Sequence, residues 1–555
     1  MATTELPNSP WTQFYHAEML GRLDQAPADA LSVFRRNAAQ DPDRAALSYL
    51  GTPTTYADLD RQSSRLAAWF GAQGFGAGDR IAVALQNVPA FVVQTLAAWK
   101  IGAAICPVNP AYTAEELGAI LGDAAPRAVL CDLRQAGVLA RAVEIADCGA
   151  VLMTIDSAEG QALLGSDVFG PAPASGPEAI RLADILADSA VPGQPWPAPA
   201  PASTALIMYT SGTTGRPKGA MHSHQSIAWA GNLFNAWIGH CAQSMILAIA
   251  PLFHITGFAA QMAASLMAGS TLLLPYRMLP AQVLDLIRRE RPTHTIGAIT
   301  AFNALLTLPD SHRDDFTSFE RVISGGAPIP PPLRDRIEAE LGLALYPGYG
   351  MTETAAASHV APFVGRIPVD TASGALTIGV PLPGTEAIVV DEHDQPVDPG
   401  EPGELLLRGR HIMSGYWNRA EETAEALKGG WMHTGDIVVM DAAGWFYVVD
   451  RKKDVIIASG FKVWPREVED CLYGHPAIRE AAVVGVPDAY RGETVKACVS
   501  LKPDASADPE TLAAHCRKHL AAYKVPRSFE IMAELPKTVT GKIQRNVLRQ
   551  QAAAS

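Results

Sequence analysis

The segment YTSGTTGRPKG occupies residues 209–219 and directly continues the apolar run ALIM at 205–208. The apolar run predicts a buried strand, and the glycines and hydroxyl residues after it predict a loop. Glycines let backbone N–H groups converge on an anion, while short hydroxyl side chains and a lysine add further donors. The segment therefore predicts a phosphate-binding loop, whose candidate residues are Thr210, Ser211, Gly212, Thr213, Thr214, Gly215 and Lys218.

The same segment does not fit the phosphate loop of ordinary P-loop ATPases. That loop requires the pattern G-x-x-x-x-G-K-[ST], in which the final hydroxyl binds Mg²⁺. Counted from Gly212, Pro217 takes the position of the second glycine and Gly219 takes that of the hydroxyl residue. A different class of nucleotide site is favoured, and composition alone also leaves open a surface turn rich in glycine and threonine.

The composition is that of a large protein with more than one domain. The chain has 555 residues, of which 48% are apolar and 18% are charged, so most of it should pack into cores. The net charge of -13 disfavours nucleic acid as a partner, because such a protein repels a polyphosphate. Seven scattered cysteines predict neither disulfides nor a zinc site, and no signal peptide or spanning helix is visible, so we expect a cytoplasmic protein.

Helical and strand patterns alternate along the first part of the chain. Leu59, Leu66 and Phe70 recur at helical spacing, and the alternating run RIAVALQ follows at 80–86. This alternation predicts a mainly parallel sheet covered by helices, and thus an α/β fold. Residues 189–203 are rich in proline and alanine and predict an exposed connector before the strand that carries the loop.

Two further changes of pattern divide the chain. From about 376 to 449, short apolar runs alternate with turn sequences, which predicts a small β-barrel subdomain. After a charged cluster at 450–454, short strands interleave with helical pieces, which predicts a small mobile α+β domain. We therefore expect a large N-terminal domain of layered βα sheets at 1–450 and a C-terminal domain at 451–555.

Seven motifs give the chain a resemblance to one family. They are YTSGTTGRPKGA (209–220), PLFHITG (251–257), SGGAPI (324–329), YGMTET (349–354), TGD (434–436), DRKKD (450–454) and PKTVTGKIQR (536–545). In this order they resemble the adenylate-forming superfamily, which contains AMP-forming acyl-CoA synthetases, adenylation domains of nonribosomal peptide synthetases and beetle luciferases. The resemblance implies an acid–thiol ligase that uses ATP, Mg²⁺ and CoA through an acyl-AMP intermediate.

The resemblance also implies roles for individual residues. Lys542 would bridge the substrate carboxylate and the α-phosphate, Thr352 would contact the α-phosphate, Glu353 would bind Mg²⁺, and Tyr349 would face adenine. His254, in the motif beside the expected acyl site, would be a further catalytic residue. Each of these residues, seen alone, would be an ordinary packed or solvated side chain. The remaining residues implied at the nucleotide are Gly325, Gly326, Ala327, Gly350, Asp436 and Arg451.

Two residues of the C-terminal part are implied in the CoA step. Lys453 falls where the family has its hinge, the residue whose backbone torsions move the small domain between two poses. Gly460 would leave room for the pantetheine arm of CoA. Without the resemblance, the segment around Lys453 would be interpreted as a basic surface turn.

The sequence also limits the acid. Amino-acid-activating relatives carry an Asp where this chain has His254, and the stretch 296–306 has no basic residue to pair a second carboxylate. Amino acids and dicarboxylates are therefore disfavoured, and we expect a hydrophobic acid: a medium- or long-chain fatty acid first, an aryl or alicyclic acid second. The residues expected around the acyl pocket are Trp229, Ile255, Phe258, Met262, Ala298 and Met351.

Other interpretations stay open. The chain could load a carrier protein instead of CoA, act as a silent nucleotide-binding relative, or oxidise its substrate as a luciferase does. Oligomeric state and membrane association are open as well, and both a homodimer and a peripheral membrane contact are compatible with the sequence. His515 and His519 are interpreted as one face of an amphipathic helix rather than a zinc site, and His222 and His224 as structural or solvent-facing.

Overall fold

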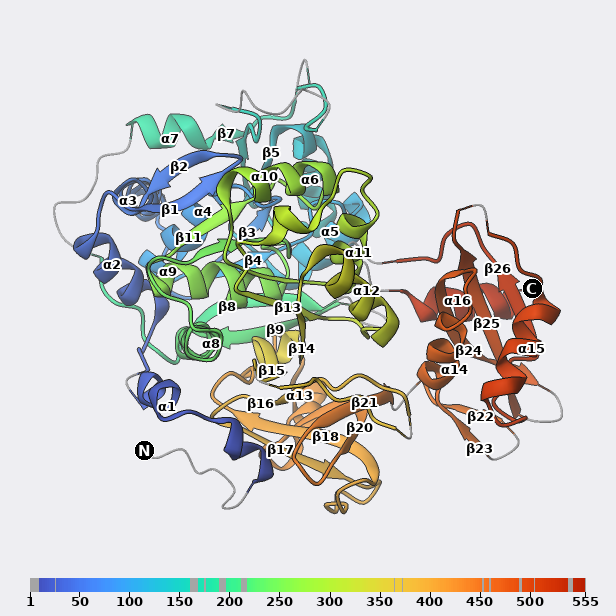
Figure 1. The fold of residues 1–555 in the computed structure, drawn as a ribbon. Coiled ribbons are helices and arrows are strands. Elements are labelled where there is room, and N and C mark those ends of the chain that lie inside the picture. The colour runs from blue at the N-terminus through green and yellow to red at the C-terminus, as the bar shows by residue number, and fades with distance from the viewer. Residues whose placement is uncertain are drawn as a thin grey trace.

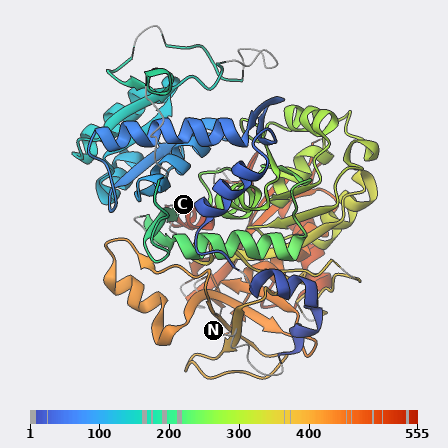
Figure 2. The same ribbon diagram turned by 90° about the vertical axis from the view of Figure 1, so that its left-hand side faces the viewer.

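The fold is that of a computed structural model, drawn in Figure 1. The residues that it describes are 9–24, 26–159, 168–173, 176–188, 196–210, 217–363, 365–371, 373–451, 454–458, 461–488, 492–503, 505–537 and 543–554. Two large sheets covered by helices form the main body, a smaller sheet lies below them in Figure 1, and a C-terminal unit lies to one side. In the view of Figure 2 that C-terminal unit lies behind the rest of the molecule. The α/β fold with a smaller C-terminal part is thus confirmed.

The first large sheet has nine strands in the order β16-β15-β14-β13-β12-β10-β11-β1-β2. The strands from β14 to β1 run parallel, and antiparallel strands flank them at both edges. Their bounds are β1 (Ala45–Tyr49), β2 (Thr52–Thr55), β10 (Met245–Leu247), β11 (Thr271–Leu274), β12 (His294–Gly297), β13 (Arg321–Gly325), β14 (Leu345–Met351), β15 (Ala356–Val360) and β16 (Val380–Pro381).

The second large sheet has eight strands in the order β19-β9-β8-β4-β3-β5-β6-β7. The strands from β8 to β7 run parallel, whereas β9 is antiparallel to both β8 and β19. Their bounds are β3 (Arg80–Ala84), β4 (Ala104–Pro107), β5 (Ala128–Asp132), β6 (Val151–Ile155), β7 (Ile180–Arg181), β8 (Thr204–Thr210), β9 (Lys218–Ser223) and β19 (Gly415–Tyr416). The predicted connector before β8 has no regular structure at 196–203, and residues 189–195 lie outside the described residues.

Helices cover both sheets, and several of them begin at a residue whose side chain caps them. Thr55 and Thr113 accept hydrogen bonds from backbone N–H groups in the first turns of their helices, and Ser223 does the same for the helix after β9. The helices of the main body are α1 (Ala17–Asp24), α2 (Ala30–Gln40), α3 (Tyr56–Ala72), α4 (Pro89–Lys100), α5 (Ala114–Ala124), α6 (Ala136–Ala146), α7 (Leu182–Asp188), α8 (His224–Ile238), α9 (Ala264–Ala268), α10 (Pro280–Glu290), α11 (Ile299–Leu306), α12 (Pro331–Leu341) and α13 (Ala420–Ala426). Short 3₁₀-helices are η1 (Pro10–Phe14), η2 (Leu133–Gln135), η4 (Arg313–Phe316), η5 (Thr352–Thr354) and η6 (Lys428–Gly430), and η3 (Thr256–Ala263) is a π-helix.

One hydrophobic core joins the two sheets. It contains Leu47 of β1, Ile81 of β3 and Phe258 of η3, all fully buried. Phe91 of α4 packs edge-on against Phe258, with 6.4 Å between the ring centroids. The two sheets are therefore parts of one packed body.

The third sheet has four antiparallel strands in the order β17-β18-β20-β21. Its strands are β17 (Thr385–Val390), β18 (Pro402–Gly409), β20 (Met432–Met440) and β21 (Phe446–Arg451). This sheet lies where the small β-barrel is expected. Phe446 of β21 is also joined by an isolated antiparallel bridge to Gly379, next to β16, so the sheet extends beyond its four strands and closure into a barrel stays a prediction.

The C-terminal unit has a sheet in the order β23-β22-β25-β24, with β26 parallel to β25. Its strands are β22 (Ile456–Ala458), β23 (Phe461–Val463), β24 (Ile478–Asp488), β25 (Gly492–Leu501) and β26 (Ser528–Ile531), and its helices are α14 (Pro465–Tyr473), α15 (Pro509–His519) and α16 (Arg545–Ala554). The predicted boundary at 450/451 stays a prediction; β21 ends at Arg451 and β22 begins at Ile456.

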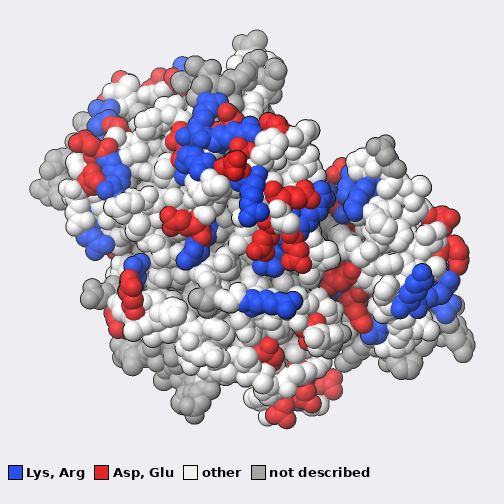
Figure 3. Space-filling model, in the orientation of Figure 1, with Lys and Arg blue, Asp and Glu red and all other residues white. Residues whose placement is uncertain are grey.

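The surface carries charges of both signs close together. On the face seen in Figure 3, basic and acidic side chains lie beside one another. Arg288 at the end of α10, for example, pairs with Asp310 and Asp315. No helix among the described residues is long and apolar enough to cross a membrane.

Candidate active site

The predicted phosphate loop joins two strands whose ends are described. Thr210 ends β8 and Lys218 begins β9, and the two are Cα partners across the hairpin. A Cβ atom on Gly219 would lie 2.7 Å from a methyl carbon of Ile207, so the close packing of the two strands requires glycine there. The hairpin thus fixes both ends of the loop. The predicted residues between them, Ser211, Gly212, Thr213, Thr214 and Gly215, lie outside the described residues.

Two further motifs lie at the carboxyl ends of neighbouring parallel strands. Gly325 ends β13 and is the Cα partner of Gly348 on β14. A Cβ on Gly325 would lie 2.5 Å from the carbonyl oxygen of Gly348, and one on Gly350 would lie 1.6 Å from that of Ala356. Bare backbone is therefore required at both positions. Ligands of α/β sheets bind at this edge, and the predicted residues Gly326 and Ala327 follow directly in the turn.

Tyr349 and Asp436 are joined across two different sheets. The Tyr349 hydroxyl donates to the Asp436 carboxylate over 2.6 Å, and Asp436 is 5% exposed. The backbone N–H of Asp436 donates to the hydroxyl oxygen of Thr434. Arg451 is the Cα partner of Asp436 on β21, although its side chain lies outside the described part of the structure. The fold thus brings together three residues that the motifs assigned to adenine and ribose.

Glu353 lies in the 3₁₀-helix η5, and its carboxylate is held in place. Its Oε1 atom accepts a hydrogen bond of 2.7 Å from the Tyr416 hydroxyl, and its backbone oxygen accepts one from the N–H of Met413. Burial and the neighbouring Glu353 charge raise the pKa of Tyr416, so the hydroxyl stays protonated and donates. The adjacent Thr352 is fixed through its carbonyl oxygen, which accepts a 2.8 Å hydrogen bond from Nε2 of His222.

Buried histidines lie behind this turn. Burial lowers the pKa of both His222 and His411 to about 4, and that of His359 to about 3, so all three are neutral at pH 7. Neither ring nitrogen of His411 has a hydrogen-bond partner among the described residues. His224 is also buried and packs edge-on against Trp99. Both His222 and His224 are thus structural, not solvent-facing.

His254 begins the segment expected to face the acid. Its Nδ1 atom accepts a 3.3 Å hydrogen bond from the N–H of Thr256, where η3 begins. A π-helix is rare and occurs often at functional sites. Of the residues expected around the acyl pocket, Ala298 and Met351 are partly buried, and the others, Trp229, Ile255, Phe258 and Met262, belong to the hydrophobic core.

Three predicted residues of the C-terminal part, Lys453, Gly460 and Lys542, lie outside the described residues. Their neighbours form an ion-pair network around Arg545 on α16. Arg545 lies 2.6 Å from Glu469, 3.3 Å from Asp454 and 3.6 Å from Asp450. Burial lowers the pKa of Arg545, but these three carboxylates outweigh that effect and raise it. The two aspartates flank the predicted hinge, so the network links that hinge to the helix that follows Lys542.

His515 and His519 lie on α15, as expected for a helix face. Nε2 of His515 donates to the backbone oxygen of Cys471 over 2.9 Å. Within the described ranges, no group of three or more His, Cys, Asp or Glu side chains could hold a metal ion.

Tyr416 lies outside all seven motifs but belongs to the site. This residue is 9% exposed, and its ring lies 5.2 Å from the amine of Lys218 while its hydroxyl contacts Glu353. The signal was available: a buried tyrosine normally finds a partner for its hydroxyl, and Tyr416 lies in the aromatic sequence GYW at 415–417. What the sequence could not give was the identity of that partner, 63 residues away.

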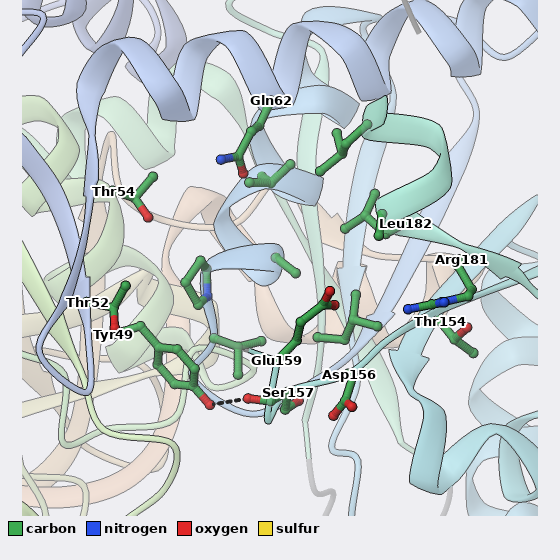
Figure 4. A pocket seen from close by; sticks show the side chains of 17 residues that line it. Tyr49, Thr52, Thr54, Gln62, Thr154, Asp156, Ser157, Glu159, Arg181 and Leu182 are labelled. Atoms are coloured by element: carbon green, nitrogen blue, oxygen red, sulfur yellow. Dashed lines mark hydrogen bonds between the residues drawn. The ribbon is translucent and has the colours of Figure 1, made fainter. Parts of the chain in front are cut away.

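A separate pocket of about 390 Å³ lies elsewhere in the large body (Figure 4). It is lined by side chains of β1, β2, α3, α4, β6, β7 and α7 and of the loop after β6, and none of the described motif residues lines it. The Tyr49 hydroxyl donates to the backbone oxygen of Ser157 at its edge, over 3.0 Å. It is therefore distinct from the candidate active site.

Comparisons with known proteins agree along nearly the whole chain. The family model for AMP-binding enzymes matches residues 34–417, and that for the AMP-binding enzyme C-terminal domain matches residues 467–542. The chain is 35% identical to the long-chain-fatty-acid–CoA ligase of Bacillus subtilis (strain 168), over 98% of either chain. It is 36% identical to the feruloyl-CoA synthase of an Amycolatopsis species, over 93% of this chain and 97% of that one. Among solved structures, the anthranilate CoA ligase AuaEII in complex with anthranoyl-AMP has a TM-score of 0.85 at 25% identity, covering 96% of this chain and 99% of that one.

Proposed function

Because the chain belongs to the AMP-binding enzyme family, we propose that it is an AMP-forming acyl-CoA ligase that activates a hydrophobic monocarboxylic acid. The observation that carries this proposal is the convergence at one edge of the sheets. The Tyr349–Asp436 pair suits a nucleoside, and the cation of Lys218 and the carboxylate of Glu353 both contact Tyr416, beside the phosphate-loop hairpin. An adenine nucleotide carries a base, a ribose and charged phosphates, so its site must hold polar, cationic and metal-binding groups close to one another.

The proposed reaction has two steps. In the first, a carboxylate oxygen of the acid bonds to the α-phosphorus of ATP while the bond to pyrophosphate breaks, which gives acyl-AMP. In the second, the CoA sulfur, after its proton has left to solvent, bonds to the acyl carbon while the bond to AMP breaks. The first step brings two anions together, so a cation must offset their repulsion, and we assign that role to Lys542.

The residues present fit a Mg²⁺ ion that arrives with ATP. Mg²⁺ is bound in such sites by one or two carboxylates together with phosphate oxygens, rather than by a cage of protein ligands. Glu353 offers one buried carboxylate, and the described residues hold no larger cluster of metal-binding side chains. When bound, the ion would offset charge on the phosphate oxygens. Glu353 would hold it, and Thr352 would direct its hydroxyl to the α-phosphate.

We infer a fatty acid as the first candidate substrate and an aryl acid as the second. The residues expected around the acid are apolar, and the stretch 296–306 has no basic side chain for a second carboxylate. The relatives include both a long-chain-fatty-acid–CoA ligase and a feruloyl-CoA synthase. Burying an unpaired charge costs several kcal/mol, so amino acids and dicarboxylates should be poor substrates. A homodimer, a peripheral membrane contact and a cytoplasmic location remain predictions.

The first experiment tests the reaction and its substrate. The purified protein is given ATP, Mg²⁺ and a panel of fatty, aryl, amino and dicarboxylic acids, with and without CoA. We expect acid-dependent exchange of pyrophosphate into ATP without CoA, and release of AMP with CoA. Formation of ADP and phosphate would contradict the proposal, and faster turnover of a dicarboxylic or amino acid would contradict the substrate. Acyl-AMP that reacts with a carrier protein but not with CoA would favour that alternative.

The second experiment separates the two steps. Lys542→Ala should lose acyl-AMP formation, at a cost on the order of 3 kcal/mol in the activation free energy, but should retain thioester formation from supplied acyl-AMP. Lys453→Pro restricts the proposed hinge and Gly460→Leu blocks the proposed CoA path, so both should show the reverse defect. Equal loss of both steps in a folded Lys542→Ala protein would contradict the assigned roles.

A further inference from the structure

Tyr416 is held rigidly at the edge of the second large sheet. It lies on β19 and is the Cα partner of Ala220 on β9. Its backbone N–H donates to the Thr423 hydroxyl over 2.9 Å. The preceding Gly415 has a φ of 146°, and a Cβ atom there would lie 2.7 Å from a methyl carbon of Thr423. Strand pairing, this hydrogen bond and close packing therefore fix the backbone position of Tyr416.

The side chain of Tyr416 contacts two groups of opposite charge. Its hydroxyl donates to Oε1 of Glu353 over 2.7 Å, and the amine of Lys218 lies 5.2 Å from the centre of its ring. A hydrogen bond to a carboxylate and a cation on an aromatic face are both favourable and both directional. Among the described residues, Tyr416 is the one side chain that hydrogen-bonds to the Glu353 carboxylate.

We propose that Tyr416 is a positioning residue that sets the orientation of the Glu353 carboxylate for the Mg²⁺ ion of ATP and keeps the amine of Lys218 beside it. This inference rests on the proposed function. With Oε1 held by the hydroxyl, the carboxylate has one orientation before the nucleotide binds, and Oε2 is left for the metal. Residues that orient a metal ligand in this way usually change metal affinity when they are replaced. Loss of the hydroxyl contact to Glu353 should therefore affect Mg²⁺ binding, and its effect should be separable from that of losing the ring contact to Lys218.

Two substitutions separate the hydroxyl from the ring. Tyr416→Phe removes the hydrogen bond to Glu353 and keeps the ring under Lys218. It should raise the Mg²⁺ concentration needed for half-maximal ATP binding about tenfold, with ATP affinity at saturating Mg²⁺ nearly unchanged. Tyr416→Leu removes both contacts and should also weaken ATP binding at saturating Mg²⁺. Binding is measured by calorimetry without any acid, so the result does not depend on turnover.

Tyr447→Phe is the matched control. Tyr447 is buried on β21 and donates to the carboxylate of Asp441 over 2.9 Å, at the turn between β20 and β21. Its replacement removes the same kind of bond outside the candidate site and should leave the Mg²⁺ dependence of ATP binding unchanged. A shift equal to that of Tyr416→Phe would show a general effect on stability and would overturn the proposal.

A double variant tests whether Tyr416 acts through Glu353. Glu353→Gln should itself weaken the Mg²⁺ dependence, and adding Tyr416→Phe to it should change that dependence by less than twofold. A full additional effect, or an unchanged Mg²⁺ dependence in Tyr416→Phe alone, would overturn the proposal. If the wild-type protein binds no ATP in the presence of Mg²⁺, the proposed function itself fails, and this outcome is distinct from the other two.

Discussion

Replacing the buried His411 should make the protein less sensitive to acid. Burial and the nearby His222 lower the pKa of His411 to about 4, against about 6.5 for an imidazole in the unfolded chain. As pH falls, the unfolded chain takes up a proton first, so stability is lost between about pH 6.5 and pH 4 and is fully present above that range. At pH 5 the loss amounts to about 2 kcal/mol for this residue.

The perturbation is His411→Leu, which removes the titrating group from the same buried place. The free energy of unfolding is measured in urea by tryptophan fluorescence at pH 7 and pH 5, for the variant and the wild type. The fall between the two pH values should be smaller in the variant by about 2 kcal/mol. His393→Leu is the control, because the His393 side chain is 78% exposed and is solvated in both states.

An equal fall in the variant and the wild type would contradict this prediction, because His411 would then protonate as readily in the folded protein as in the unfolded one. The candidate site is in contact with this histidine cluster. His411 lies near His222, whose ring holds the carbonyl oxygen of Thr352. Because both rings stay neutral in the folded protein down to about pH 4, nucleotide binding by the folded protein should weaken only near that pH.

Two other predictions follow from contacts in the site and near the hinge. Tyr349→Phe removes the hydrogen bond to the Asp436 carboxylate. A bond to a charged group contributes about 1.5 kcal/mol, so ATP binding measured by titration should weaken about tenfold. Unchanged affinity would mean that Asp436 is oriented without this bond. Arg545→Met leaves the buried Glu469 carboxylate without its ion-pair partner, whereas Asp454 keeps its pair with Arg549. It should destabilise the C-terminal unit by about 3 to 5 kcal/mol, measured by hydrogen exchange in α14 and α16. Exchange at the wild-type rate would contradict the importance of this ion-pair network.

Local patterns in the sequence determined the elements and the class of chemistry. The helix with Leu59, Leu66 and Phe70 is α3, and the run RIAVA is β3, because helical and strand periodicities depend on neighbouring residues alone. The phosphate-loop sequence and the motifs after it predicted a nucleotide site and the family for the same reason, since each motif is a short contiguous stretch. The strand pairing of the small β-subdomain was not predictable in this way, because it joins segments far apart in the chain, such as Gly379 and Phe446.

Which residues meet in the site depends on the packing of the whole fold. Tyr349 and Asp436 are 87 residues apart in the chain, and Tyr416 and Glu353 are 63 apart, yet each pair shares a hydrogen bond. Such contacts depend on the order of strands in three sheets and on the hairpin that β19 joins, and no local pattern encodes these. The protonation of His222, His359 and His411 was hidden for the same reason, because burial by the whole fold sets it. The sequence determined what kinds of groups the site contains, and the packing of distant strands determined how they are held.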